Sequence, residues 1–106
     1  MIRVLAAKND APFSSAQLNL LSRHLPSQVI SAAGRYKRWQ DAQAFLWGRY
    51  LLTKGLQYYG FEKNILPDIQ YTTYNRPYLP VPLDFNISHS GDYIACAFTD
   101  NKAAYH

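Results

Sequence analysis

A donor-rich run, Ser88-His89-Ser90-Gly91, is the part of the sequence best suited to binding an anion. It follows the hydrophobic alternation of residues 85–87 and precedes the apolar run Tyr93 to Phe98. Both patterns predict strands, so the run between them is expected to form a hairpin turn or a loop that cradles phosphate. Small residues leave backbone N–H groups accessible, and Ser and His add side-chain donors. A solvated tight turn is the alternative interpretation.

Positive charge occurs at three places near the expected ends of elements: one run of basic residues and two single arginines. Arg35-Tyr36-Lys37-Arg38 precedes the longest helical pattern, and cations beside a helix N-terminus strengthen an anion site. A solvated helix end explains most of this run, but Arg38 shares a helical face with Phe45 and Arg49 and is expected to face the structure. Arg49 lies on an apolar face, where pairing with an acid is favoured over ligand binding. Arg76, held in a turn by Pro77, offers a planar fork for phosphate or a flat base.

The sequence contains no recognisable catalytic or metal-binding set. Ser88 and His89 are adjacent, so their side chains diverge and cannot form a nucleophile–base pair. His24, His89 and His106 lack metal-ligand spacing, and the seven acids are scattered. The single cysteine, Cys96, excludes a disulfide framework and is expected to be a small core residue. These patterns predict contacts to an anion without a catalytic centre.

Length and composition predict one small domain over residues 1–106. Hydrophobic residues make up 48% of the chain, including nine Tyr, five Phe and two Trp, so a core can form. The net charge of +4 suits a phosphate-bearing partner, whether nucleotide, nucleic acid or anionic lipid. No apolar run approaches membrane-spanning length, and Met1-Ile2-Arg3 does not begin a signal peptide, which predicts a cytoplasmic protein without membrane contact.

The expected elements give an α+β fold in which a small antiparallel sheet packs against a long helix. They are a strand Ile2–Ala7, a helix from Ser14 or Ser15 to Arg23, a short helix Gln28–Ala33, a long helix Arg35–Tyr59 ended by Gly60, and short strands at Ile69–Thr73, Tyr78–Leu79, residues 85–87 and Tyr93–Phe98.

The long helix is expected to be apolar on more sides than a small domain can cover. Its core stripe is predicted to be Ala42, Phe45, Leu52, Leu56 and Tyr59. Gly48 and Gly55 are expected to let another backbone approach closely. The surplus of apolar faces, and a final strand expected to present an unpaired edge, indicate a missing partner surface.

Three segments together resemble a known family: RYKRWQDAQAFLWGRYLLTKGLQYYG, YNRPYLP and FNISHSG. They are similar to the N-terminal half of surfactin-synthetase-type phosphopantetheinyl transferases, over roughly Pro26 to Phe98. The resemblance implies one half of a pseudo-dimer of two α+β halves that hold coenzyme A between them. With magnesium, such enzymes transfer the phosphopantetheine arm of coenzyme A to a serine of an acyl or peptidyl carrier protein.

The resemblance also implies site residues. Ser88 and His89 would contact the coenzyme A phosphates, and Arg76 would lie beside the nucleotide end. Positions that are basic in many members hold uncharged residues here, namely Gln28, Ser31 and Ala44. The grip on the ribose phosphate would therefore pass to a neighbouring cation, namely Arg35, Lys37, Arg38 or Arg49, or be weaker.

The magnesium-binding acids of the family lie in a Gly-Ile-Asp stretch and a Trp-x-x-Lys-Glu motif that would follow His106. The first hypothesis is therefore a transferase N-terminal domain that supplies coenzyme A contacts and is inactive alone. It would require its missing C-terminal half or a second copy. The second is a non-catalytic module that binds coenzyme A or a partner as a homodimer. A nucleic-acid binder is disfavoured because no nucleic-acid motif appears.

Overall fold

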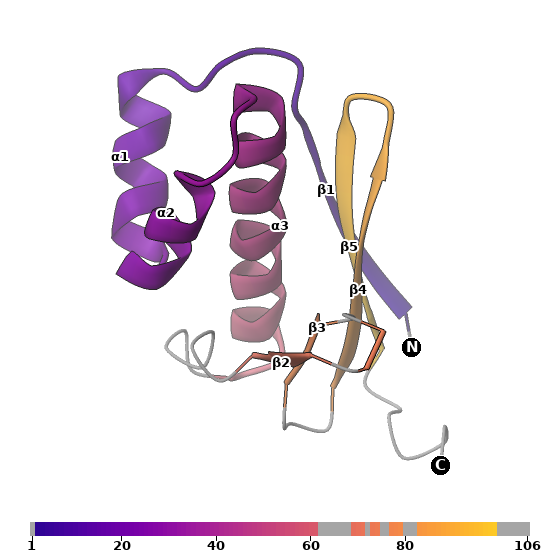
Figure 1. The fold of residues 1–106 in the computed structure, drawn as a ribbon. Coiled ribbons are helices and arrows are strands. Elements are labelled where there is room, and N and C mark those ends of the chain that lie inside the picture. The colour runs from indigo at the N-terminus through magenta and orange to yellow at the C-terminus, as the bar shows by residue number, and fades with distance from the viewer. Residues whose placement is uncertain (1, 62–68, 72, 75–76, 80–82, 100–106) are drawn as a thin grey trace.

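The computed structural model describes residues 2–61, 69–71, 73–74, 77–79 and 83–99 (Figure 1). The elements follow the order β1 (Ile2–Lys8), α1 (Ser15–His24), α2 (Ser27–Ala33), α3 (Trp39–Tyr58), β2 (Gln70–Tyr71), β3 (Pro77–Tyr78), β4 (Asp84–Ser90) and β5 (Tyr93–Thr99). The predicted α+β class is confirmed, with a small antiparallel sheet against a long helix. Among the described residues, no helix is long and apolar enough to cross a membrane.

The main sheet has the strand order β1-β5-β4, and both pairs are antiparallel. Thr99 of β5 is opposite Ile2 on one side and Asp84 on the other. The expectation that the final strand presents an unpaired edge is therefore wrong, because β5 is the centre of this sheet. β2 and β3 form a separate two-stranded ribbon.

The core lies between the sheet and the helices, all of which are on one side of the sheet (Figure 1). The buried apolar residues include Leu52 and Leu56 of α3, Phe85 of β4, and Cys96 and Phe98 of β5. Burial raises the pKa of the Cys96 thiol to about 12, so this cysteine stays protonated and acts as the predicted small core residue.

The apolar faces of α3 are covered largely within the chain, since α1 and α2 lie against one side and the sheet against the other (Figure 1). Of the predicted core stripe, Leu52 and Leu56 are fully buried, whereas Ala42, Phe45 and Tyr59 are only half-buried. The stripe is displaced because a helix between two layers buries two faces rather than one.

Gly48 and Gly55 lie where α3 packs against the sheet. A Cβ atom on Gly55 would lie 2.0 Å from Cζ of Phe98, and one on Gly48 would lie 3.1 Å from Cγ2 of Ile87. The close approach predicted at these two glycines is therefore found, but the approaching groups are side chains of β4 and β5 rather than another backbone.

The predicted helix ends are present at α1 and at the end of α3. Ser14 caps α1 by a capping box, in which Gln17 N–H donates to Ser14 Oγ at 3.2 Å and Ser14 N–H donates to Gln17 Oε1 at 2.8 Å. Gly60 has a φ of 86°, and Phe61 N–H donates to the Leu56 carbonyl at 2.8 Å. This is the Schellman ending that the glycine predicts.

The beginning of the long helix differs from the prediction. α3 begins at Trp39 with Arg38 as its N-cap residue, whereas residues 35–38 form a turn after α2. The turn is continuous with α2, because Arg35 N–H and Tyr36 N–H donate to the carbonyls of Ala32 and Ala33. No side-chain hydrogen bond caps the start of α3 at Arg38. Without a capping residue in the sequence, the predicted start rested on helical periodicity alone and was placed too early.

A buried glutamine fixes the segment between β1 and α1 on the start of α3. Gln43 is 6% exposed and donates from Nε2 to Asn9 Oδ1 at 2.8 Å and to the Ala11 carbonyl at 3.0 Å. Its Oε1 accepts from Phe13 N–H. The side chain therefore provides hydrogen-bond partners for backbone groups of a loop that has no secondary structure of its own.

Candidate anion-binding pocket

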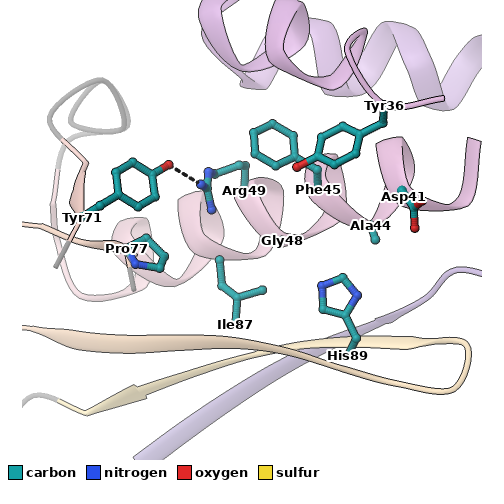
Figure 2. Close-up of a pocket in the computed structure, with 10 residues that line it drawn as sticks. All are labelled: Tyr36, Asp41, Ala44, Phe45, Gly48, Arg49, Tyr71, Pro77, Ile87 and His89. Carbon is teal, nitrogen blue, oxygen red and sulfur yellow. Dashed lines mark hydrogen bonds between the residues drawn. The ribbon is translucent and has the colours of Figure 1, made fainter. Parts of the chain in front are cut away.

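A cavity of about 520 Å³ lies between α3, the β4 strand and the β2–β3 ribbon (Figure 2). Its walls combine aromatic rings, small residues and a few polar groups. The lining residues are Tyr36, Asp41, Ala44, Phe45, Gly48, Arg49, Tyr71, Pro77, Ile87 and His89. The volume is in the range typical of small-molecule sites.

The Ser-His-Ser run lies in a strand rather than in a turn or a phosphate-cradling loop. β4 continues to Ser90, which is opposite Tyr93, so only Gly91 and Asp92 form the hairpin turn. Gly91 has a φ of 59°, the left-handed conformation that such a two-residue turn requires. The predicted loop is therefore wrong, because the strand alternation of residues 85–87 simply continues through the run.

The strand places Ser88 and His89 on opposite faces of the sheet, since successive side chains of a strand alternate. His89 and Ile87 point toward α3 and line the pocket (Figure 2). Ser88 is exposed on the face without helices and does not line the cavity. The structure thus brings only one of these two predicted phosphate contacts into the pocket.

Arg49 is the second predicted site residue that reaches the pocket. It is 8% exposed, and its Nη2 donates to the Tyr71 hydroxyl at 3.0 Å. The guanidinium carbon lies 4.8 Å from the centroid of the Phe45 ring. The partners of Arg49 among the described residues are thus a hydroxyl and a ring, and no carboxylate like the one favoured from the sequence pairs with it there.

The basic run does not contribute its charges to this pocket. Arg35, Lys37 and Arg38 are exposed, and the expectation that Arg38 faces the structure is wrong because it is the N-cap residue, ahead of the first helical turn. Only Tyr36 of the run lines the main cavity, with its ring 5.6 Å from that of Phe45. Arg35 lines a separate hollow with Ala32 and Tyr36. Arg76 lies outside the described residues.

Sequence reasoning missed three polar residues of the pocket: Tyr36, Asp41 and Tyr71. Asp41 lies in the first turn of α3, where a carboxylate is stabilised by the helix dipole. In Figure 2, Asp41 and Arg49 lie toward opposite ends of the cavity. The pocket therefore offers an anion site near Arg49 and an acceptor for hydrogen-bond donors near Asp41. No signal in the sequence pointed to Asp41, because the helix predicted from Arg35 places this residue beyond the first turn.

A smaller cavity of about 200 Å³ adjoins the first and shares Phe45, Arg49 and Tyr71 with it. Its other lining residues come from α2 and from the start of the ribbon: Pro26, Gln28, Val29, Ala32 and Ile69. Arg49 therefore lies where the two cavities meet. In the parts of the chain that the structure describes, no group of three His, Cys, Asp or Glu residues could hold a metal ion.

Two comparisons with known proteins agree with each other. Residues 11–101 match the family described as 4'-phosphopantetheinyl transferase, N-terminal. The chain is also 30% identical over 103 residues to a protein of Aneurinibacillus migulanus named 4'-phosphopantetheinyl transferase gsp. That alignment covers 95% of this chain and 43% of the relative, so the chain spans less than half of that protein's length.

Proposed function

The chain belongs to the family of 4'-phosphopantetheinyl transferase N-terminal domains, and from this premise we propose that it forms one wall of a coenzyme A site. The complete enzyme would transfer the phosphopantetheine arm of coenzyme A to a serine of an acyl or peptidyl carrier protein. We propose that residues 1–106 act as a single domain of that enzyme. A cytoplasmic location stays a prediction from the sequence.

The observation that carries the proposal is the pocket between α3 and β4. It brings His89, from the FNISHSG segment, to the same cavity as the buried cation Arg49. Imidazole and guanidinium N–H groups are suitable donors to phosphate oxygens, and their hydrogen bonds to an anion are charge-assisted. The Phe45 and Tyr36 rings beside them offer apolar surface to the remainder of the ligand.

The other predicted contacts take different roles in this proposal. Arg35 and Arg38 are exposed outside the main cavity, so they would attract an anionic ligand over a longer range rather than hold it. Arg76 would contact the nucleotide end, as the resemblance implies. Ser88 would meet a ligand only from the opposite face of the sheet.

Magnesium would act only in the complete enzyme. The described residues do not fit a magnesium site, because they bring no cluster of acidic ligands together. We therefore derive no metal-dependent step from this chain. The contribution of these residues is to bind and orient coenzyme A through Arg49 and His89.

The His89→Ala variant is expected to bind coenzyme A about five-fold more weakly or worse, because a donor to phosphate is lost. Arg76→Ala should act in the same direction. Ser88→Ala is the matched control: it changes the adjacent residue on the opposite face and should leave the affinity unchanged. Calorimetric titration of the 106-residue chain with coenzyme A measures all three. Equal affinities for wild type and His89→Ala would refute the proposed contact, as would equal losses in the Ser88 and His89 variants.

The alternative function, a homodimeric binding module, is favoured by one feature of the sheet. The face that points away from the helices exposes apolar side chains: Ile2 is 72% exposed, Val4 58% and Tyr93 52%. Ala6, Ala95 and Ala97 lie on the same face, since they share its alternation. An apolar face of this kind is typical of an interface, and two copies related by a two-fold axis would cover each other's exposed face.

We expect the isolated chain to sediment as a dimer at micromolar concentration. Val4→Lys should shift it to the monomer, because a lysine on each copy would lose its hydration in the apolar interface. Leu18→Lys is the matched control, since Leu18 is 47% exposed on α1, on the other side of the molecule. A wild-type monomer with a cooperative thermal melt would contradict the dimer.

A further inference from the structure

The connection between α2 and α3 presents positive charge and a tryptophan on the surface of the molecule. We call this group the basic turn, and its members are Arg35, Lys37, Arg38 and Trp39, all of them exposed. In the described part of the chain none of the three cations forms an ion pair, and the pair found there joins Lys8 to Asp10. The charge of the basic turn is therefore not neutralised by the described acids.

Hydrogen bonds at both ends fix the backbone of the basic turn. Arg35 N–H donates to the Ala32 carbonyl at 3.2 Å, and the Arg38 carbonyl accepts from Ala42 N–H at 3.1 Å. Between these bonds, the ring of Tyr36 packs against an aromatic ring of α3 at a centroid distance of 5.6 Å. The basic side chains therefore project from an ordered support, which lowers the entropic cost of binding a partner.

The basic turn borders one end of the main cavity without lining it. Tyr36, inside the turn, and Asp41, two residues after it, both line that cavity, whereas no member of the basic turn lines it or the adjoining 200 Å³ cavity. In Figure 2, Asp41 and His89 lie toward the same end of the main cavity, away from Arg49. The charge of the turn thus lies outside the cavity, next to the end that His89 lines.

We propose that the basic turn is a docking surface for an acidic face of the carrier protein that presents the acceptor serine. The inference rests on the proposed function and adds the surface by which this chain recognises its protein substrate. The serine must reach a ligand in the cavity, so the protein that bears it has to cover the surface beside the cavity. Acidic side chains around the serine would pair with the three cations, and such charge complementarity steers encounter and fixes the orientation of the partner.

The composition of the basic turn favours a protein partner over a small ligand. Trp39 is 40% exposed, and tryptophan and arginine are enriched among the residues that contribute most to protein interfaces. Arg35 also lines a hollow of about 250 Å³ with Ala32 and Tyr36, into which a side chain of the partner can insert. A protein surface with several acids can contact these residues at once, whereas a ligand held in the cavity cannot.

The test measures two affinities of the 106-residue chain by calorimetric titration, one for an apo acyl carrier protein and one for coenzyme A. Trp39→Ala is expected to weaken binding of the carrier protein about ten-fold and to leave the affinity for coenzyme A unchanged. Arg38→Gln should weaken binding of the carrier protein about three- to five-fold and reduce its dependence on salt concentration. The second variant also covers the case in which Trp39→Ala does not fold.

Arg23→Gln and Leu18→Ala are the matched controls, because they remove an exposed cation and an exposed apolar side chain from α1. Both should bind the carrier protein as the wild type does. Wild-type affinity for the carrier protein in Trp39→Ala and Arg38→Gln would overturn the inference and leave the proposed function intact. Equal losses of both affinities in Trp39→Ala would also overturn it.

Vesicles of anionic phospholipid distinguish a membrane from a protein partner. Loss of vesicle binding in the same two variants, with unchanged affinity for the carrier protein, would show that the basic turn binds a membrane and that the inference is wrong. A wild-type chain that binds coenzyme A but no carrier protein would overturn the inference as well. Failure of the wild-type chain to bind coenzyme A would instead refute the proposed function.

Discussion

Replacing Gly55 with alanine is expected to lower the free energy of unfolding by about 3 kcal/mol, or to prevent folding altogether. The added Cβ would lie 2.0 to 2.5 Å from three atoms of the Phe98 ring, far inside van der Waals contact. Phe98 is 1% exposed and cannot move outward, so α3 and β5 would have to separate. Urea unfolding followed by circular dichroism measures the change.

Gly48→Ala is the matched control, because it makes the same substitution in the same helix. Its Cβ would lie 3.1 Å from Cγ2 of Ile87, so this methyl group would have to move by only a few tenths of an ångström. Alanine also gains about 1 kcal/mol of helix propensity over glycine, so the net change should be small. Phe98→Leu combined with Gly55→Ala should recover part of the lost stability. Equal losses at the two glycines would show that contact with the Phe98 ring is not the cause.

Transfer of phosphopantetheine to an apo carrier protein is expected to be undetectable with the 106-residue chain alone, with or without magnesium. Group transfer from coenzyme A needs neutralisation of its phosphates by a metal, and the described residues offer no metal site. Mass spectrometry of the carrier protein after incubation with coenzyme A measures the product directly. Full modification by the purified chain would contradict this expectation.

A chimera supplies the positive control for this experiment. In it, the chain replaces the matched part of the Aneurinibacillus migulanus transferase, which retains the rest of its own sequence. The chimera is expected to modify the carrier protein, and the same chimera with His89→Ala should do so with a higher Michaelis constant for coenzyme A. An inactive but folded chimera would argue for the non-catalytic module.

The features that the sequence predicted correctly depend on local interactions. The capping box of Ser14 and Gln17 and the Schellman ending at Gly60 each involve residues a few positions apart. Their signals are side-chain types at fixed spacing, which sequence alone contains. Cys96 was placed in the core for a similar reason, because its apolar neighbours predict a buried strand.

The features that were missed depend on distant contacts or on competing local patterns. Two of these contacts join segments that only the tertiary fold brings together. They are the hydrogen bond between Arg49 and Tyr71 and the hydrogen bond between Gln43 and Asn9. Ser88–Ser90 was misassigned because small polar residues are typical of turns, whereas pairing with β5 holds them in a strand. The position of β5 at the centre of the sheet is likewise a property of the topology, which periodicity does not encode.

The pairing of the first strand with the last has a consequence for how the chain folds. β1 pairs with β5 along its whole length, and in the described sheet β5 is its one partner, since β4 pairs with the other edge of β5. During synthesis, β1 therefore waits without its partner until β5 has left the ribosome. Closing so long a loop is entropically unfavourable, so the sheet should assemble late and cooperatively, on the slower timescale of folds with high contact order. Until then the apolar side chains and the unpaired edge of β1 are exposed, and such surfaces favour aggregation during folding.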